Sequence, residues 1–152
     1  MNKRLQEFVA NFPWVQNEHI PWAEMKKPLK KSKLALISTG GIYVKGDQPF
    51  AIKTREDVDE SFRKIPREAP LGQLEIAHEH YNKRYAQEDI NTVFPISRLE
   101  KLLAEGFIGD IAQVNYSITG YIPEPKGLYI SGKTIALDLK EMEVDSVLLV
   151  PV

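Results

Sequence analysis

The sequence contains no cysteine. This absence excludes disulfide bonds, cysteine-ligated zinc and a thiol nucleophile within these residues. Serine and threonine hydroxyls cannot carry out two-electron thiol chemistry. A redox reaction of the thiol type therefore needs a group that these 152 residues do not supply.

An excess of one charge sign is also absent. Twenty Lys and Arg face 21 Asp and Glu, for a formal net charge of -1. Nucleic acids and anionic membranes are therefore not expected partners. No segment has the roughly 18 apolar residues of a membrane span, and the N-terminus MNKRLQEFVANFPWV lacks the apolar stretch of a signal peptide. The expected location is cytoplasmic.

What is present is the composition of an ordinary folded domain, with 43% hydrophobic and 27% charged residues. Apolar residues at helical spacing predict a short amphipathic helix over 3–12, ended by Pro13. A proline-rich arm follows and carries Trp14 and Trp22. Either these rings anchor the arm on its own core or they contact a partner. We expect an N-terminal helix and arm over 1–33 and one α/β domain over 34–152.

Strand and helix patterns alternate in the second half of the chain. This alternation predicts an α/β fold, a three-layer, mainly parallel sheet with flanking helices. The segment 43–72 is expected to be irregular, with one helical turn near 56–62. Strands are expected at 34–37, 74–78, 112–118 and 147–150, and helices at 97–106 and 132–142.

The segment 147–150, in EMEVDSVLLVPV, has the apolar, β-branched composition of a strand buried on both faces. Such a strand is normally followed by a crossover helix. The pattern therefore also fits an incomplete half of a larger domain.

Four polar or glycine-containing segments follow predicted strands, at 38–41, 78–81, 119–121 and 151–152. The carboxyl ends of parallel strands share one edge of the sheet, where α/β domains bind their ligands. We expect these segments to meet there. Thr119, Gly120 and Tyr121 are expected to form one wall of the site.

The residues Thr39, Gly40 and Gly41 belong to the turn STGG. Paired glycines permit a nest of backbone N–H groups that binds a carboxylate or phosphate. The alternative is a tight turn from strand to loop.

His78 and His80 are two residues apart, so on an extended segment both rings point to the same face. Two histidines do not define a metal site, and no third ligand is fixed by spacing. We therefore predict no metal, and favour one acid or base, or histidines that support the loop through hydrogen bonds.

Arg63 and Arg67 flank a rigid Ile65–Pro66 pair. Two arginines at this spacing suit a bidentate clamp on a carboxylate. The alternative is pairing with nearby acids such as Glu60 and Glu68.

Several blocks occur in an order that resembles the selenoprotein B component of the glycine, sarcosine, betaine and D-proline reductases. The resemblance runs from about His19 to Val152. It rests on HIPW, ALISTGGIYVKGDQPF, FRKIPREAP, IAHEHYN, DINTVFPISRLEKLLAEGFIGDIA, YSITGYIP and VDSVLLVPV.

The resemblance implies reductive cleavage of a C–N bond in a small amino acid or betaine. It implies a selenocysteine or cysteine after the last strand, a separate pyruvoyl-bearing partner subunit, and no cofactor in this chain. The selenocysteine or cysteine is absent here. Either translation ended at a selenocysteine codon, or the chain is a naturally short relative.

Two hypotheses follow. The first is a reductase-family domain, catalytically incomplete as given and without a catalytic residue of its own, whose pocket walls still hold a small amino acid or betaine-like ligand. The second is a non-enzymatic interaction or regulatory subunit that keeps only the scaffold. It would bind a reductase subunit or a second copy of itself.

Overall fold

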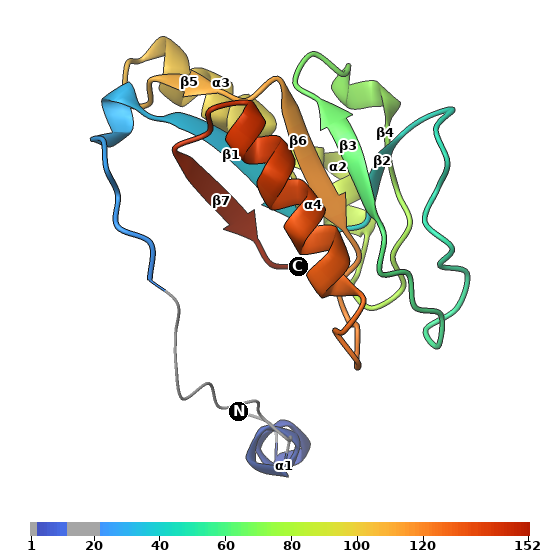
Figure 1. Ribbon diagram of the computed structural model, residues 1–152. Coiled ribbons are helices and arrows are strands. Elements are labelled where there is room, and N and C mark those ends of the chain that lie inside the picture. The colour runs from blue at the N-terminus through green and yellow to red at the C-terminus, as the bar shows by residue number, and fades with distance from the viewer. Residues whose placement is uncertain (1–2, 12–21) are drawn as a thin grey trace.

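The structure is a computed structural model that describes residues 3–11 and 22–152 (Figure 1). Its helices are α1 (Lys3–Asn11), α2 (Arg84–Glu88), α3 (Ile96–Ala104) and α4 (Leu128–Glu141), with 3-10 turns η1 (Leu29–Lys31), η2 (Leu71–Gln73) and η3 (Ile90–Thr92). Its strands are β1 (Lys33–Ser38), β2 (Ile42–Val44), β3 (Phe62–Pro66), β4 (Leu74–Ile76), β5 (Asp110–Ile111), β6 (Val114–Ile118) and β7 (Ser146–Val150).

The main sheet has five strands, with β1 at its centre. Strand β1 runs parallel to β5 and β6 on one side and to β7 on the other. Strand β3 pairs antiparallel with β6. Strands β2 and β4 form a separate antiparallel pair. The expected α/β fold with a mainly parallel sheet is confirmed.

The sheet is covered on both faces, which gives three layers (Figure 1). On one face Ala35 and Tyr116 pack with Ile135 and Leu139 of α4. On the other face Leu34, Leu36 and Ile111 pack in one core with residues such as Phe94 and Leu99. The two cores follow from the alternation of side chains along β1.

Two local expectations were wrong. No helical turn forms over 56–62, and within the segment 43–72, expected to be irregular, residues 62–66 form strand β3. This strand lies at a sheet edge, where charged Arg63 and Lys64 precede buried Ile65 and interrupt the apolar pattern. The strand expected over 74–78 ends at Ile76. Beyond it the chain bends, so the two histidines that follow do not lie on a strand.

Strand β7 forms where expected, but the prediction that both its faces are buried was wrong. Val147 and Leu149 keep 40% and 66% of their surface exposed. Among the described residues β7 pairs only with β1. Helix α4 leaves a groove of about 330 Å³ beside β7, lined by apolar residues that include Ile37, Ile118, Val147 and Leu149.

Near the N-terminus, α1 forms within the expected range, and none of its residues is buried. Trp22 is 88% exposed. The alternative in which this ring anchors the arm on the core was therefore wrong. Aromatic rings suit both cores and interfaces, and the sequence alone does not separate the two. Trp14 lies outside the described residues. No helix in the described part of the chain is long and apolar enough to cross a membrane.

Candidate functional site

The carboxyl ends of β1, β6 and β7 meet at one edge of the sheet. The backbone N–H of Thr39 donates to Val150 O at 3.0 Å, and that of Gly41 donates to Ile118 O at 3.0 Å. The N–H of Val152 donates to Thr39 Oγ1 at 2.9 Å. Direct hydrogen bonds therefore join the turn at 38–41 to Val152 and to the last residues of β6 and β7.

The fourth segment, 78–81, packs against the same turn. Ala77 N–H donates to Gly41 O at 2.9 Å, and the Tyr81 hydroxyl donates to Gly40 O at 3.1 Å. Gly41 has a φ of +68°, and a Cβ there would lie 2.3 Å from Ala77 O. Only glycine allows this close approach of the two chain segments.

The N–H groups of the STGG turn are all used inside the protein. Thr39 and Gly41 donate to strand carbonyls, and Gly40 N–H donates to Ser38 Oγ at 3.0 Å. The Ser38 hydroxyl in turn donates to Val93 O at 2.7 Å. Of the two alternatives, the STGG segment therefore forms the tight turn. None of these three N–H groups is left to bind an anion.

His78 lies beneath this turn and is only 2% exposed. Its Nδ1 accepts a hydrogen bond of 3.0 Å from the backbone N–H of His80. Its Nε2 is buried and has no hydrogen-bond partner. This nitrogen lies 3.0 Å from the point where a Cβ on Gly120 would stand, and Thr39 O and Val152 O each lie 3.4 Å from that point.

The surroundings of His78 keep its ring neutral. Burial lowers the pKa of His78 from its ordinary value, and the nearby His80 and Lys83 lower it further, while Glu79 opposes them. The ring of Tyr81 lies 4.6 Å from that of His78. Burial also raises the pKa of Tyr81 to about 12, so that hydroxyl stays protonated at neutral pH.

His80 faces a different environment. Its ring stacks on Tyr121 at 3.9 Å, and its Nε2 lies 2.8 Å from Arg55 O. Tyr121 holds a left-handed φ of 57°, which is uncommon for a tyrosine and aims the ring at His80. Sequence reasoning missed Arg55, because a backbone contact across 25 residues leaves no local pattern.

The two histidines do not form a shared metal site. His78 Nδ1 accepts the His80 N–H and its Nε2 is buried, while His80 Nε2 lies 2.8 Å from Arg55 O. Within residues 3–11 and 22–152, no group of three or more metal-ligating side chains could hold an ion.

Arg63 lies near this edge but binds its own loop. Its guanidinium donates to Gln48 O at 2.6 Å and Pro49 O at 2.8 Å, and stacks 4.2 Å from the Phe50 ring. Asp59 lies 3.6 Å away as an ion-pair partner. These contacts occupy much of the guanidinium and fix the 48–61 loop.

Arg67 lies away from this edge. It forms a bidentate pair with Glu100, at 2.7 and 2.9 Å, and a contact with Asp110 at 3.2 Å. Because β3 runs antiparallel to β6, its last residue Pro66 pairs with Val114 at the amino end of that strand. The structure therefore does not bring the two arginines together as a clamp.

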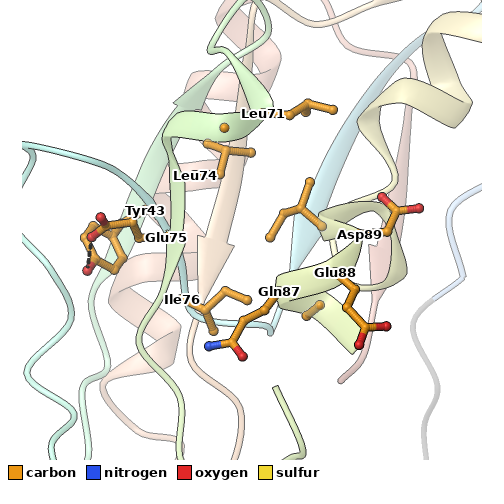
Figure 2. A pocket seen from close by; sticks show the side chains of 11 residues that line it. Tyr43, Leu71, Leu74, Glu75, Ile76, Gln87, Glu88 and Asp89 are labelled. Atoms are coloured by element: carbon orange, nitrogen blue, oxygen red, sulfur yellow. Dashed lines mark hydrogen bonds between the residues drawn. The ribbon is translucent and has the colours of Figure 1, made fainter. Parts of the chain in front are cut away.

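An open cavity of about 600 Å³ lies elsewhere, between the β2–β4 pair and α2 (Figure 2). Among the described residues that line it are the carboxylates Glu75, Glu88 and Asp89 and no basic side chain. The Tyr43 hydroxyl donates to Glu75 at 2.6 Å, and this bond raises the pKa of Tyr43. Such a lining disfavours a ligand that is held by its carboxylate.

Residues 2–152 match the family described as Glycine/sarcosine/betaine reductase selenoprotein B (GRDB). The chain is 35% identical over 129 residues to D-proline reductase subunit gamma of Acetoanaerobium sticklandii. It is 30% identical over 146 residues to glycine reductase complex component B subunit gamma of Carboxydothermus hydrogenoformans. It is 26% identical over 146 residues to betaine reductase complex component B subunit beta of Peptoclostridium acidaminophilum.

These alignments cover most of this chain and a smaller share of each relative. They include 84% of this chain and 52% of the D-proline reductase subunit. For the glycine and betaine reductase subunits they include 95% of this chain and 33% of the relative. No solved structure matches the chain. The family match over nearly all residues shows that the chain belongs to the glycine/sarcosine/betaine reductase selenoprotein B family.

Proposed function

We propose that this chain supplies the substrate-holding scaffold of a reductase of this family. The ligand is a small amino acid or betaine-like molecule, bound by its carboxylate at the edge where β1, β6 and β7 end. The walls are the turn at 39–41, the segment 78–81 and residues 119–121. In this proposal the chain works within a multi-subunit reductase that cleaves a C–N bond reductively.

The observation that carries this proposal is the buried His78 at that edge. It has an unpartnered Nε2 where the ends of three parallel strands meet. Ligands of α/β domains bind at such strand ends. The names of the relatives add support, since they are subunits of glycine, D-proline and betaine reductases.

Reductive cleavage of a C–N bond consumes two electrons. With no cysteine in the sequence, a thiol or selenol has to come from outside these 152 residues. We therefore place the redox group elsewhere in the assembly and assign binding and orientation to this chain. A pyruvoyl-bearing subunit is the partner that this proposal pairs with it.

A melting screen tests the binding step. A ligand that binds only the folded chain raises the melting temperature, because it stabilises the folded state by RT ln(1 + [L]/Kd). We expect glycine, sarcosine, betaine or D-proline to raise it, and tetramethylammonium chloride, which has no carboxylate, to leave it unchanged. No shift with any of the four up to tens of millimolar would contradict the proposal.

A second candidate function is a non-enzymatic interaction subunit. The exposed Val147 and Leu149, together with the apolar groove beside α4, favour it. Apolar surface of this kind is typical of a face that packs on another polypeptide. Analytical ultracentrifugation, alone and with a pyruvoyl-bearing reductase subunit, tests it, because a chain that stays monomeric in both samples has no such role.

A further inference from the structure

His78 Nε2 is a buried polar atom without a hydrogen-bond partner, and within residues 3–11 and 22–152 no other side chain is in this position. Buried polar groups are nearly always paired, because an unpaired one loses its bonds to water without compensation. The unpaired nitrogen of His78, at the carboxyl edge of a parallel sheet, therefore indicates a binding partner that the described residues do not supply.

The hydrogen-bond network fixes which proton His78 carries. The backbone N–H of His80 can only donate, so Nδ1, which accepts it at 3.0 Å, carries no hydrogen. In the neutral ring the hydrogen is then on Nε2. His78 therefore presents a donor at Nε2. In this state the nitrogen cannot accept a proton or bind a metal ion.

The neutral form of the His78 ring is the one that the folded protein favours. Burial lowers the pKa of His78, and the neighbouring His80 and Lys83 lower it further. Among the described residues that affect this pKa, Glu79 alone opposes the lowering, and it is itself paired with Lys83 at 2.7 Å. The Tyr81 ring and its protonated hydroxyl complete the surroundings.

The donor faces Gly120, which has no side chain. A Cβ at this position would stand 3.0 Å from Nε2. Val152 O and Thr39 O each lie 3.4 Å from that point. Val152 is exposed, and its N–H is bonded to Thr39 Oγ1 at 2.9 Å.

Several other donors at this edge are used within the protein. The N–H groups of Thr39, Gly40 and Gly41 bond within the protein, and Arg63 binds its own loop. Among the described side chains, His78 Nε2–H is the buried donor without a partner. In a low-dielectric site an N–H group bonds more strongly to an ionised acceptor than to a neutral one.

We propose that the Nε2–H of His78 binds one oxygen of a ligand carboxylate beside Gly120, where no side chain stands in front of the ring. This inference rests on the proposed function and deepens it, because it names the residue that recognises the ligand and the group that is recognised. Acetate is the simplest probe of this chemistry. The amino-acid and betaine ligands are larger members of the same class.

Nuclear magnetic resonance of the histidine rings tests the proposal on the chain as it exists. A long-range ¹H–¹⁵N spectrum reports which ring nitrogen carries the hydrogen. We expect His78 to be protonated at Nε2. We also expect its Nε2 resonance to move on titration with acetate, glycine or betaine and not with tetramethylammonium chloride.

The matched variants are Gly120→Ala and Gly132→Ala. Neither glycine has a left-handed φ, so alanine fits both backbones. A methyl at position 120 blocks the donor, whereas a Cβ at Gly132 meets nothing within 4 Å. We expect Gly120→Ala to raise the dissociation constant for the carboxylate at least about tenfold, and Gly132→Ala to leave it unchanged.

The outcomes separate this inference from the proposed function. A melting shift with a carboxylate while His78 Nε2 stays unmoved would overturn the inference and leave the proposed function standing. A hydrogen on Nδ1, or equal affinity in the Gly120→Ala variant, would also overturn it. If no carboxylate changes either the melting temperature or the ring, both fail.

Discussion

Two glycines shape the candidate site in different ways. Gly41 allows the turn to approach Ala77 O, where any Cβ would stand 2.3 Å away. Gly120 places no side chain in front of the His78 ring. The sequence pattern STGG suggested an anion nest or a tight turn, and periodicity could not decide between them, because the fate of each N–H depends on strands far away in the chain.

We predict that Gly41→Ala lowers the free energy of unfolding by about 2 kcal/mol or more. The alanine would be strained in the left-handed backbone conformation, and its Cβ would also clash with the backbone of Ala77. Gly46→Ala is the control. Gly46 also has a positive φ, of +95°, but a Cβ there meets nothing within 4 Å. The Gly46→Ala substitution should lower the free energy of unfolding by about 1 kcal/mol. Urea denaturation measures both values, and equal costs would show that the contact with Ala77 is unimportant.

The depressed pKa of His78 predicts an effect of pH on stability. Burial holds the native ring neutral, whereas the unfolded ring gains a proton below about 6.5. Unfolding then takes up a proton, so the free energy of unfolding falls as the pH drops from about 7 to 5, by at most about 1.4 kcal/mol per pH unit.

Carboxylates with lowered pKa values, such as Asp59 and Asp138, affect the free energy of unfolding in a lower pH range. Their stabilisation is lost only as the pH falls below about 4. Urea titrations at pH 7.5, 6.5 and 5.5 should therefore isolate the histidine effect. The variant His78→Gln, which cannot titrate, should have a flatter profile, and an unchanged slope in this variant would contradict the assignment.

At the scale of the element, α4 begins where a distant loop reaches it. Glu60 Oε1 accepts from Gly127 N–H at 3.0 Å, and Glu60 O accepts from the Ser131 hydroxyl at 2.6 Å. A carboxylate at a helix N-terminus bonds a free N–H group and complements the helix dipole. The sequence predicted a helix over 132–142, four residues short at its start, because the group that caps it lies 67 residues away.

The variant Glu60→Ala should therefore lower the free energy of unfolding by about 1 kcal/mol. Glu124→Ala is the comparison, since Glu124 is also close to the start of α4 but strongly exposed. It should change stability by less than about 0.5 kcal/mol. Thermal and urea unfolding measure both. Equal effects would mean that the contact with Gly127 contributes nothing specific.

Strand β7 is the other element whose environment differed from expectation. Its apolar run predicted a strand correctly, but composition cannot tell whether a neighbour covers that strand. Both faces carry exposed apolar surface. If the surface beside α4 binds a partner, Leu149→Glu should abolish the association that sedimentation detects. Leu137→Glu, at an exposed position of α4 outside the groove lining, should preserve it.

At the scale of the whole molecule, the strands that carry the site were predictable from sequence, and so was their convergence. Apolar runs such as 34–37 and 147–150 predict strands, and parallel strands bring their carboxyl ends to one edge. The antiparallel strand β3 was not predictable in this way, because its charged edge lacks an apolar run. Its direction decides that Arg67 pairs with Glu100 at the opposite end of the sheet.

We propose above that a small carboxylate ligand binds where β1, β6 and β7 end. A backbone amide shift map with glycine, sarcosine, betaine and D-proline tests this binding directly. We expect shifts confined to residues 39–41, 78–81, 119–121 and 151–152. Shifts confined to the cavity between the β2–β4 pair and α2 (Figure 2), or no shifts at all, would contradict it.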